Sequence, residues 1–340
     1  MKMSRYAPYL GVVAALAVFV LFVSHVPSTR VYESAPPLVL APVGSSTLAV
    51  VTQTVATTAV AQPLAPIKPD PFVGAASILR EALVNIICFA PSTSGTHSVS
   101  GSGVIVSPTG IIITNAHIAQ YYLLANDGVT CDVRTGSPAT STYKAMLAYL
   151  PPAWIEDNAS LITQHMPRGT GERDFALLAI SNPPQGLAYV SLATKEPRRD
   201  QEVSIASYAA QNLSPDQVRS GFYPTVVLST IKDVLTFKAN TPDVLEFVGS
   251  LAAQEGSSGG GVVDSHARLL GIISTSKVFG DVADRTLRAI STSYIRREYE
   301  RETGQHFESA LATPGSTLVE LFAPRVAPLR TILEDAIRHQ

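Results

Sequence analysis

Charged residues, cysteine and tryptophan are all scarce in this chain of 340 residues. Charged side chains make up 15% of it, the formal net charge is −2, and no long run of like charges occurs. Nucleic-acid-binding proteins normally present a basic patch or stripe, so we expect no nucleic-acid partner. The length allows one large domain or two of ordinary size.

The cysteines and histidines also lack the spacing of a metal site. Neither a C-x-x-C nor an H-x-x-x-H pair occurs among the two cysteines and seven histidines, and we therefore expect no metal and no cofactor. Cys88 and Cys131 lie in hydrophobic segments. They can be two buried thiols or, outside the cytoplasm, a stabilising disulfide, and the sequence leaves both alternatives open.

A long apolar run is present only near the amino terminus. Lys2 and Arg5 precede an uncharged apolar run at residues 7–23, which with its flanks is long enough to cross the hydrocarbon core of about 30 Å. The preceding positive charge predicts an amino terminus in the cytoplasm. We interpret residues 1–27 as a cytoplasmic stub and transmembrane anchor in preference to a cleaved signal peptide, because only a weak V-x-S follows the run. Either interpretation makes the rest of the chain periplasmic or extracellular.

Residues 28–75 form a second zone, in which prolines punctuate Ala, Val, Thr and Ser. Proline fixes φ and removes a backbone donor, so this zone predicts a tether of mixed flexible and polyproline II character.

A globular domain is expected over residues 76–304, followed by a helical tail at 305–340. Many short β-rich runs with turn signals between them predict an all-β barrel or sandwich. Helices are expected at the edges: one before the first strand, one at 292–304 with Thr292 as its cap and Gly304 as its stop, and one at the carboxyl end. The segment 145–170, around Trp154, is expected to be a surface insertion.

Three segments supply the residue types of a nucleophilic active site. "TNAHIAQ" offers His117, "GERDFALLAI" offers Asp174 directly before an apolar strand, and "EGSSGGGVVD" offers a serine between glycines. A serine hydroxyl becomes nucleophilic when a histidine takes its proton and a carboxylate orients that histidine. Glu172 and Asp132 are rival carboxylates, but neither begins an apolar strand.

The glycine pattern distinguishes the two adjacent serines. In the frame G-x-S-G-G, Gly256 lies two residues before Ser258, whereas the frame of Ser257 has Glu255 at that position. Glycines around a nucleophile let the backbone turn and aim N–H groups at an oxyanion. Ser258 is therefore the predicted nucleophile.

Taken together, these motifs resemble the chymotrypsin/trypsin-like serine peptidases, and most of all their bacterial HtrA/Deg-type branch. The similar stretches are "GSGVIVSPTGIIITNAHI", "DFALLAI" and "GSSGGGVV…LLGIIS", and the order His, Asp, Ser is that of the family. The resemblance, which covers about residues 76–300, implies a chymotrypsin-like fold of two antiparallel six-stranded β-barrels with the site between them.

By this resemblance, His117 is the general base, Asp174 orients it and Ser258 attacks. The backbone N–H groups of Gly256 and Ser258 would form the oxyanion hole. The residues expected to bind substrate are Ala252, Ser274, Thr275 and Ser276, of which Ala252 gives a small, uncharged pocket floor suited to small or medium apolar side chains.

Two departures from the family pattern modify this expectation. Ser257 replaces the aspartate that digestive trypsin-like enzymes place before the nucleophile, so activation by a freed amino terminus has no anchor. The residues after 300 are too few for a PDZ domain. We expect a membrane-tethered serine endopeptidase that acts on protein or peptide substrates, in quality control if it follows the HtrA branch, and that can form homo-oligomers. The alternative is a non-catalytic peptide-binding or scaffold module on the same fold.

Overall fold

The computed structural model describes residues 70–92, 95–163, 170–210, 213–238, 240–250, 252–277 and 285–339. The chain divides into two units after Pro63, and all of these residues belong to the second unit. The predicted anchor at 1–27 and most of the predicted tether lie outside the described residues. Within those residues, no helix combines the length and apolarity needed to cross a bilayer.

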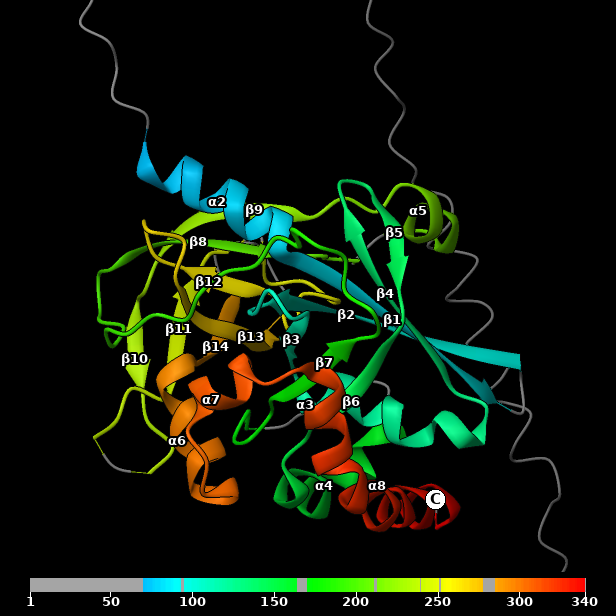
Figure 1. The fold of residues 1–340 in the computed structure, drawn as a ribbon. Helices are drawn as coiled ribbons and strands as arrows, with labels where there is room; N and C mark the ends of the chain where they lie inside the picture. Colours follow the sequence, from blue (N-terminus) through cyan, green and yellow to red (C-terminus); the bar gives the residue numbers. More distant parts are fainter. Residues whose placement is uncertain are drawn as a thin grey trace, which may run out of the picture. The chain divides into compact units, whose positions relative to one another are not determined.

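The first of two antiparallel sheets has seven strands in the order β5-β4-β1-β2-β3-β7-β6 (Figure 1). Its strands are β1 (Leu83–Ser92), β2 (Gly95–Ile105), β3 (Ile111–Thr114), β4 (Thr130–Gly136), β5 (Ala139–Tyr143), β6 (Ala145–Tyr149) and β7 (Ala176–Ile180). Every residue of β3 and β7 is buried, which explains why these two segments are apolar in the sequence except at Thr114.

The second sheet also has seven strands, in the order β10-β11-β14-β13-β12-β8-β9. They are β8 (Glu202–Ser207), β9 (Thr225–Thr230), β10 (Asp233–Leu235), β11 (Val244–Val248), β12 (Gly261–Val263), β13 (Leu269–Lys277) and β14 (Thr286–Ser291). A large apolar cluster fills the first sheet and the boundary between the sheets, and a smaller cluster lies within the second.

The count of seven strands per sheet differs from the predicted six because one bent segment supplies two strands in each sheet. Lys144 alone separates β5 from β6, yet β5 pairs with β4 at one edge of the first sheet and β6 pairs with β7 at the other. In the second sheet, Ile231 and Lys232 join β9 and β10, which again pair at opposite edges. Each sheet is therefore curled, as in a chymotrypsin-like fold.

The first helix, α2 (Pro71–Ala82), precedes β1 and begins five residues before the predicted start of the domain. Asp70 caps it, with Oδ1 accepting from the Phe72 N–H at 2.9 Å. The helix contacts strands of both sheets, among them β2, β4, β8 and β12. It therefore belongs to the globular domain and not to the tether.

Short helices lie between the strands, and three further helices close the chain. The short helices are α3 (Ala116–Ala119), η1 (Gln120–Asp127), α4 (Pro152–Asn158), η2 (Ala159–Thr163) and α5 (Pro215–Ser220), and the closing helices are α6 (Thr292–Thr303), α7 (Phe307–Ala312) and α8 (Gly315–Arg338). The cap of α6 is Ser291, not Thr292, since the Ser291 hydroxyl accepts from the Tyr294 N–H at 3.0 Å. Gly304 ends α6 in the left-handed conformation, as predicted.

The carboxyl-terminal helix α8 covers the segment that the sequence placed on the surface. It contacts β6, α4 and η2 (Figure 1), and Trp154 is only 4% exposed. The described part of segment 145–170 thus consists of an edge strand of the first sheet, β6, and the two short helices α4 and η2. It is packed and not a surface insertion, because α8 covers it.

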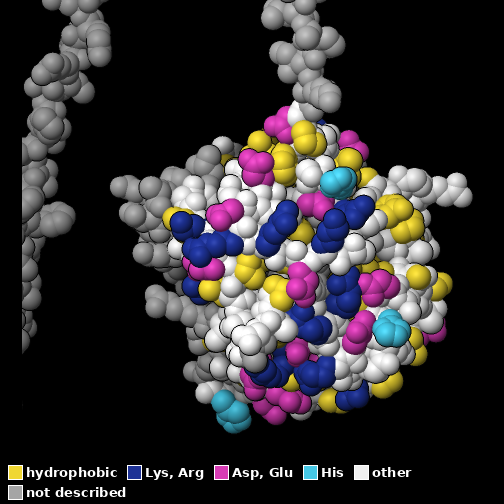
Figure 2. All heavy atoms as spheres, turned by 90° about the vertical axis from the view of Figure 1, so that its left-hand side faces the viewer, with side chains coloured by type: hydrophobic (Ala, Val, Ile, Leu, Met, Phe, Trp, Pro, Cys, Tyr) yellow, Lys and Arg dark blue, Asp and Glu magenta, His cyan; other side chains and the backbone are white. Residues whose placement is uncertain are grey.

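The outer face of the second sheet mixes charges of both signs. Figure 2 shows Lys and Arg interspersed with Asp and Glu on this face. Arg288 pairs with Glu246 at 2.8 Å, and Arg199 lies 3.9 Å from Asp233. Exposed pairs of this kind stabilise little, but they leave this face without an extended field of one sign.

Candidate active site

His117 is carried by α3, directly after the buried strand β3. Its Nδ1 lies 2.8 Å from Oδ2 of Asp174, and its backbone N–H donates to Oδ1 at 3.0 Å. Asn115 ties the same two segments together, because its Nδ2 donates to the Asp174 carbonyl at 2.9 Å. An ionised carboxylate only accepts, so the proton of a neutral imidazole lies on Nδ1 and the lone pair on Nε2.

Asp174 is a buried carboxylate with a third donor. The Ser274 hydroxyl donates to Oδ2 at 2.7 Å. Burial by itself raises the pKa of Asp174, but the charge of His117 and the hydrogen bonds from His117 and Ser274 outweigh it, and the net pKa lies below its ordinary value. Asp174 is therefore ionised at neutral pH and fixes the imidazole.

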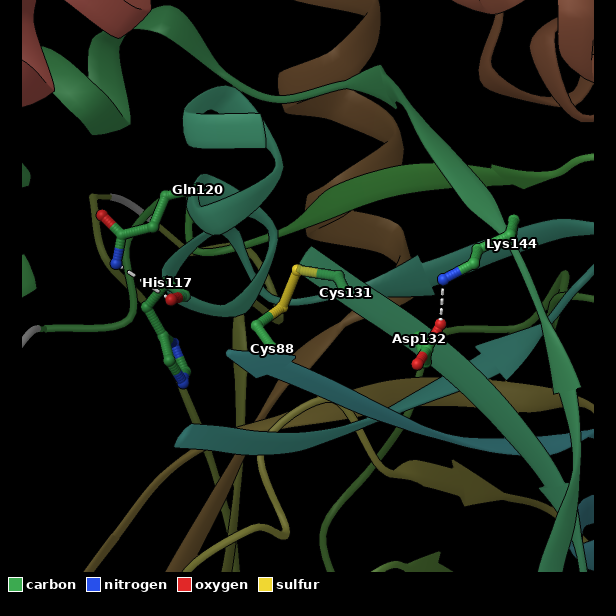
Figure 3. Close-up of a disulfide and its surroundings, with 6 residues drawn as sticks. All are labelled: Cys88, His117, Gln120, Cys131, Asp132 and Lys144. Carbon is green, nitrogen blue, oxygen red and sulfur yellow. Dashed lines mark hydrogen bonds and ion pairs between the residues drawn. A yellow bond between two sulfur atoms is a disulfide. The ribbon is translucent and has the colours of Figure 1, made fainter. Parts of the chain in front are cut away.

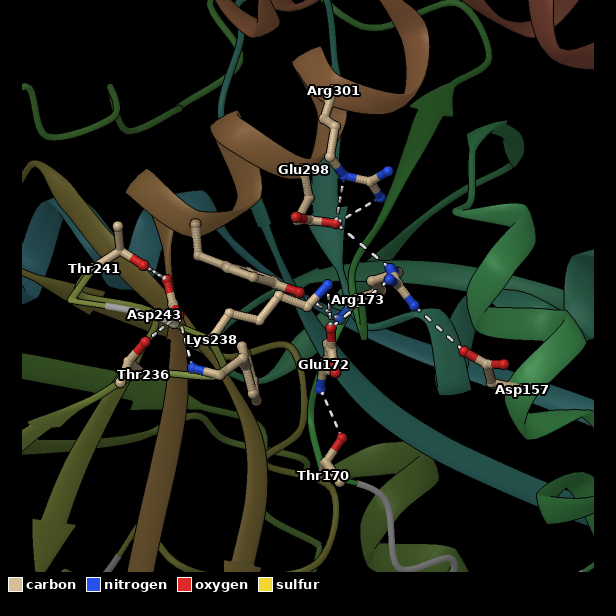
Figure 4. A network of polar contacts seen from close by, with 12 residues as sticks. Asp157, Thr170, Glu172, Arg173, Thr236, Lys238, Thr241, Asp243, Glu298 and Arg301 are labelled. Carbon is tan, nitrogen blue, oxygen red and sulfur yellow. Dashed lines mark hydrogen bonds and ion pairs between the residues drawn. The ribbon is translucent and has the colours of Figure 1, made fainter.

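The turn before Asp174 is held by two helices far apart in the sequence, α4 and α6 (Figure 4). Arg173 has a positive φ of 57°, and its N–H donates to the Tyr294 hydroxyl of α6 at 3.1 Å. The Arg173 guanidinium lies 3.3 Å from Asp157 of α4 and 3.4 Å from Glu298 of α6. These contacts orient the turn so that Asp174 faces His117.

Ser258 lies beside this pair without bonding to it directly. Its hydroxyl donates to the Ser274 carbonyl at 3.4 Å, and among the described residues no hydrogen bond joins Ser258 to His117. Ser274 therefore contacts Asp174 through its hydroxyl and Ser258 through its carbonyl. From the sequence, Ser274 was predicted only as a substrate-binding residue. Its position at the end of the motif "LLGIIS" was the one signal that could have indicated a contact with the catalytic residues.

Burial distinguishes Ser258 from Ser257. Ser257 is only 1% exposed and its hydroxyl accepts from the Ser207 hydroxyl at 3.1 Å, whereas Ser258 is partly exposed. A fully buried hydroxyl cannot meet a substrate, so only Ser258 is placed to attack.

The backbone around Ser258 leaves two N–H groups without a described partner. The carbonyls of residues 255, 256, 257 and 258 accept from the Ala210 N–H, the Ser102 hydroxyl, the Gly260 N–H and the Ser102 N–H at 2.7–2.9 Å. The N–H groups of residues 257 and 259 are also bonded. Within the described residues, those of Gly256 and Ser258, the two predicted oxyanion donors, bond to nothing.

The peptide geometry determines where these two groups point. In a trans peptide the C=O and the N–H point in opposite directions. The carbonyls of residues 255 and 257 are bonded inward, to Ala210 and Gly260, so the Gly256 and Ser258 N–H groups point away from those partners. Two free donors beside a serine hydroxyl are the arrangement that stabilises a tetrahedral oxyanion.

Two glycines allow this turn. Gly256 has φ +85°, and a Cβ there would lie 2.8 Å from the Tyr208 carbonyl oxygen. Gly259 has φ +86°, and a Cβ there would lie 1.9 Å from the Ser102 carbonyl oxygen. Both positions thus exclude a side chain by conformation and by space.

The other predicted substrate residues lie near the site residues in the sequence. Ala252 is fully buried and belongs to the apolar cluster of the second sheet. Thr275 and Ser276 continue β13 after Ser274 and pair with Arg288 and Leu287 of β14; their side chains lie outside the described part of the structure.

A disulfide joins Cys88 to Cys131, which face each other on β1 and β4 (Figure 3). It lies close to the segment that carries His117, where the Gln120 amide donates to the His117 carbonyl at 2.9 Å. Nearby, Lys144 pairs with Asp132. Asp132, one of the two rival carboxylates in the sequence, therefore pairs with Lys144, whereas Asp174 pairs with His117. In the part of the chain that the structure describes, no three His, Cys, Asp or Glu side chains converge as metal ligands.

Comparison with known families assigns the chain. A family model described as trypsin-like peptidase domain matches residues 101–272, a span that holds His117, Asp174 and Ser258. The chain belongs to this family of trypsin-like peptidase domains.

Among solved structures, the matches have low sequence identity. The active form of the Rv3671c protease from M. tuberculosis is 17% identical, with 72% of this chain and 95% of that chain covered and a TM-score of 0.46. Deg5 is 18% identical, with 68% and 93% covered and a TM-score of 0.46. No curated protein matches the sequence.

Proposed function

We propose that this protein is a serine endopeptidase that hydrolyses peptide bonds through an acyl-enzyme. The observation that carries the proposal is the pair of N–H groups, those of Gly256 and Ser258, that have no partner among the described residues. They lie next to the partly exposed Ser258 hydroxyl and an imidazole oriented by Asp174. These are the parts that acyl transfer requires: a nucleophile, a base with its orienting carboxylate, and an oxyanion site.

In the proposed reaction Ser258 first turns its hydroxyl from the Ser274 carbonyl to Nε2 of His117. Oγ then adds to the scissile carbonyl while Nε2 takes its proton, and the new oxyanion accepts from the Gly256 and Ser258 N–H groups. The imidazolium, stabilised by ionised Asp174, gives the proton to the leaving amine as the C–N bond breaks. Water then attacks the acyl-enzyme by the same proton transfer and frees Ser258.

Covalent labelling of the full-length protein with a fluorophosphonate tests this proposal. We expect wild type to be labelled on Ser258, Ser258→Ala to remain unlabelled, and Ser257→Ala, the matched control one residue away, to retain the label. Mass spectrometry locates the modified residue. A folded wild-type protein that takes no label would instead support the non-catalytic peptide-binding module.

We also propose that the peptidase works outside the cytoplasm, tethered by the apolar run at residues 7–23, on exposed segments of other proteins as the HtrA resemblance suggests. The Cys88–Cys131 disulfide supports an oxidising compartment. We expect the protein to be recovered in the membrane fraction. An added protease should digest the domain only from the non-cytoplasmic side. A chain recovered in the cytoplasmic fraction would refute the tether, and mass photometry would test the homo-oligomer.

A further inference from the structure

The Gly256 and Ser258 N–H groups stay available only if the turn at residues 255–259 keeps its conformation. The hydrogen bonds to the four carbonyls of this turn hold that conformation, and we call their donors the anchor of the turn. In this chain the described anchor contains no ion pair. Ser257 occupies the position where digestive trypsin-like enzymes have an aspartate, and its only described side-chain contact is the neutral one to Ser207.

Ser102, a fully buried residue of β2, bonds to this turn twice. Its backbone N–H donates to the Ser258 carbonyl at 2.7 Å, and its hydroxyl donates to the Gly256 carbonyl at 2.9 Å. The two bonded carbonyls lie on either side of the peptide that carries the Ser258 N–H. One residue of the first sheet thus fixes both ends of the segment that forms the oxyanion site.

Two further bonds fix Ser102 itself. Its hydroxyl accepts from the Tyr208 N–H at 2.9 Å, directly after β8, and its carbonyl accepts from the Thr114 hydroxyl at 2.7 Å, next to the helix of His117. A hydroxyl has one donor and two acceptor sites, and here the donor and one acceptor are used. Ser102 therefore connects the nucleophile turn, the end of β8 and the end of β3.

We propose that Ser102 is a positioning residue for the oxyanion hole, whose hydroxyl holds the Gly256 and Ser258 N–H groups in place. The inference rests on the proposed peptidase activity. Loss of the hydroxyl leaves the half-buried Gly256 carbonyl and the buried Tyr208 N–H without partners, so the turn rearranges to satisfy them. The displaced donors then stabilise the oxyanion less, while the surface that binds substrate is unchanged.

Fluorophosphonate labelling kinetics of the full-length protein separate these two effects. The maximal labelling rate depends on the oxyanion hole, because the phosphonyl oxygen occupies it, whereas the half-saturating concentration reports binding. We expect Ser102→Ala to lower the maximal rate about 10- to 100-fold, less than or comparable to deletion of a whole donor, with half-saturation unchanged within about twofold. Ser100→Ala, on the same strand, is the matched control and should label like wild type, because the one described bond of its hydroxyl is the bond that it accepts from Asn85.

A second pair of variants keeps the test independent of packing. Ser102→Thr and Ser102→Val have nearly the same shape and differ in the hydroxyl, so both carry the same steric cost. We expect the Thr variant to label about 10-fold or more faster than the Val variant, each measured on its folded fraction. Equal maximal labelling rates for Ser102→Ala and Ser100→Ala, or for Ser102→Thr and Ser102→Val, would overturn the role of Ser102 if the wild type is active. An unlabelled wild type would instead refute the peptidase proposal.

Discussion

At the scale of single residues, Asp174 is the point on which the candidate site converges. His117 and Ser274 donate to its carboxylate, and Asn115 donates to its backbone carbonyl. The residue types of His117, Asp174 and Ser258 and their strand contexts were predictable from the sequence. The bond from Ser274 was not, because Ser274 lies 100 residues from Asp174 and only the curl of two sheets brings them together.

Replacement of Asp174 by Asn should abolish most activity without unfolding the protein. An asparagine amide can donate to Nδ1 of His117, which moves the imidazole proton to Nε2 and removes the base. We expect the activity to fall by about 10³- to 10⁴-fold, as measured by the labelling rate. Calorimetry should show that thermal unfolding is little changed. Asp233→Asn, at an exposed carboxylate of the second sheet, is the control. A variant that keeps wild-type rates would exclude Asp174 from the mechanism.

At the scale of elements, the buried strands were the most predictable part of the fold. Residues 111–113 and 176–180 are continuously apolar and lie in buried strands, β3 and β7. The start of α8 was not predictable, because Pro324 and Pro328 interrupt a helical pattern and normally end a helix. Burial of Leu318, Phe322 and Leu329 against β6, α4 and neighbouring segments outweighs that local preference.

The contact between α6 and β6 predicts a pH-dependent stability. The Tyr149 hydroxyl donates to Glu302 at 2.9 Å, and burial raises the pKa of Glu302 above its ordinary value. A raised folded-state pKa stabilises the protein below the unfolded-state value of 4.5, and this contribution is lost as the pH rises through the folded-state pKa.

Glu302→Gln should therefore raise the melting temperature at pH 7 and leave it nearly unchanged at pH 4. Glutamine keeps an acceptor for Tyr149 but carries no charge to be desolvated. Scanning calorimetry across this range measures the difference, and Glu308→Gln, at an exposed carboxylate, is the control that should not gain stability. A Glu302→Gln variant that is less stable than the wild type at pH 7 would contradict a free-energy cost for burying the Glu302 charge.

At the scale of the whole molecule, the disulfide restrains the unfolded chain. It links residues 43 apart, so its removal should cost about 2–4 kcal/mol of unfolding free energy. Denaturant unfolding of the Cys88→Ala/Cys131→Ala double variant measures this loss. Wild type in reducing agent should approach the variant, and the variant itself should not respond to reductant. Identical midpoints for wild type and variant would show that the bond adds nothing to global stability.

The junctions between β5 and β6 and between β9 and β10 constrain the length of the chain as well as its residue types. Lys144 alone joins β5 to β6, and side chains alternate between the faces of a strand. One residue inserted there would invert that alternation: Leu147, now buried, would turn outward, and Met146, now exposed, would turn inward. Divergent homologues should therefore vary freely in the residue at this junction but conserve the spacing between the two strands.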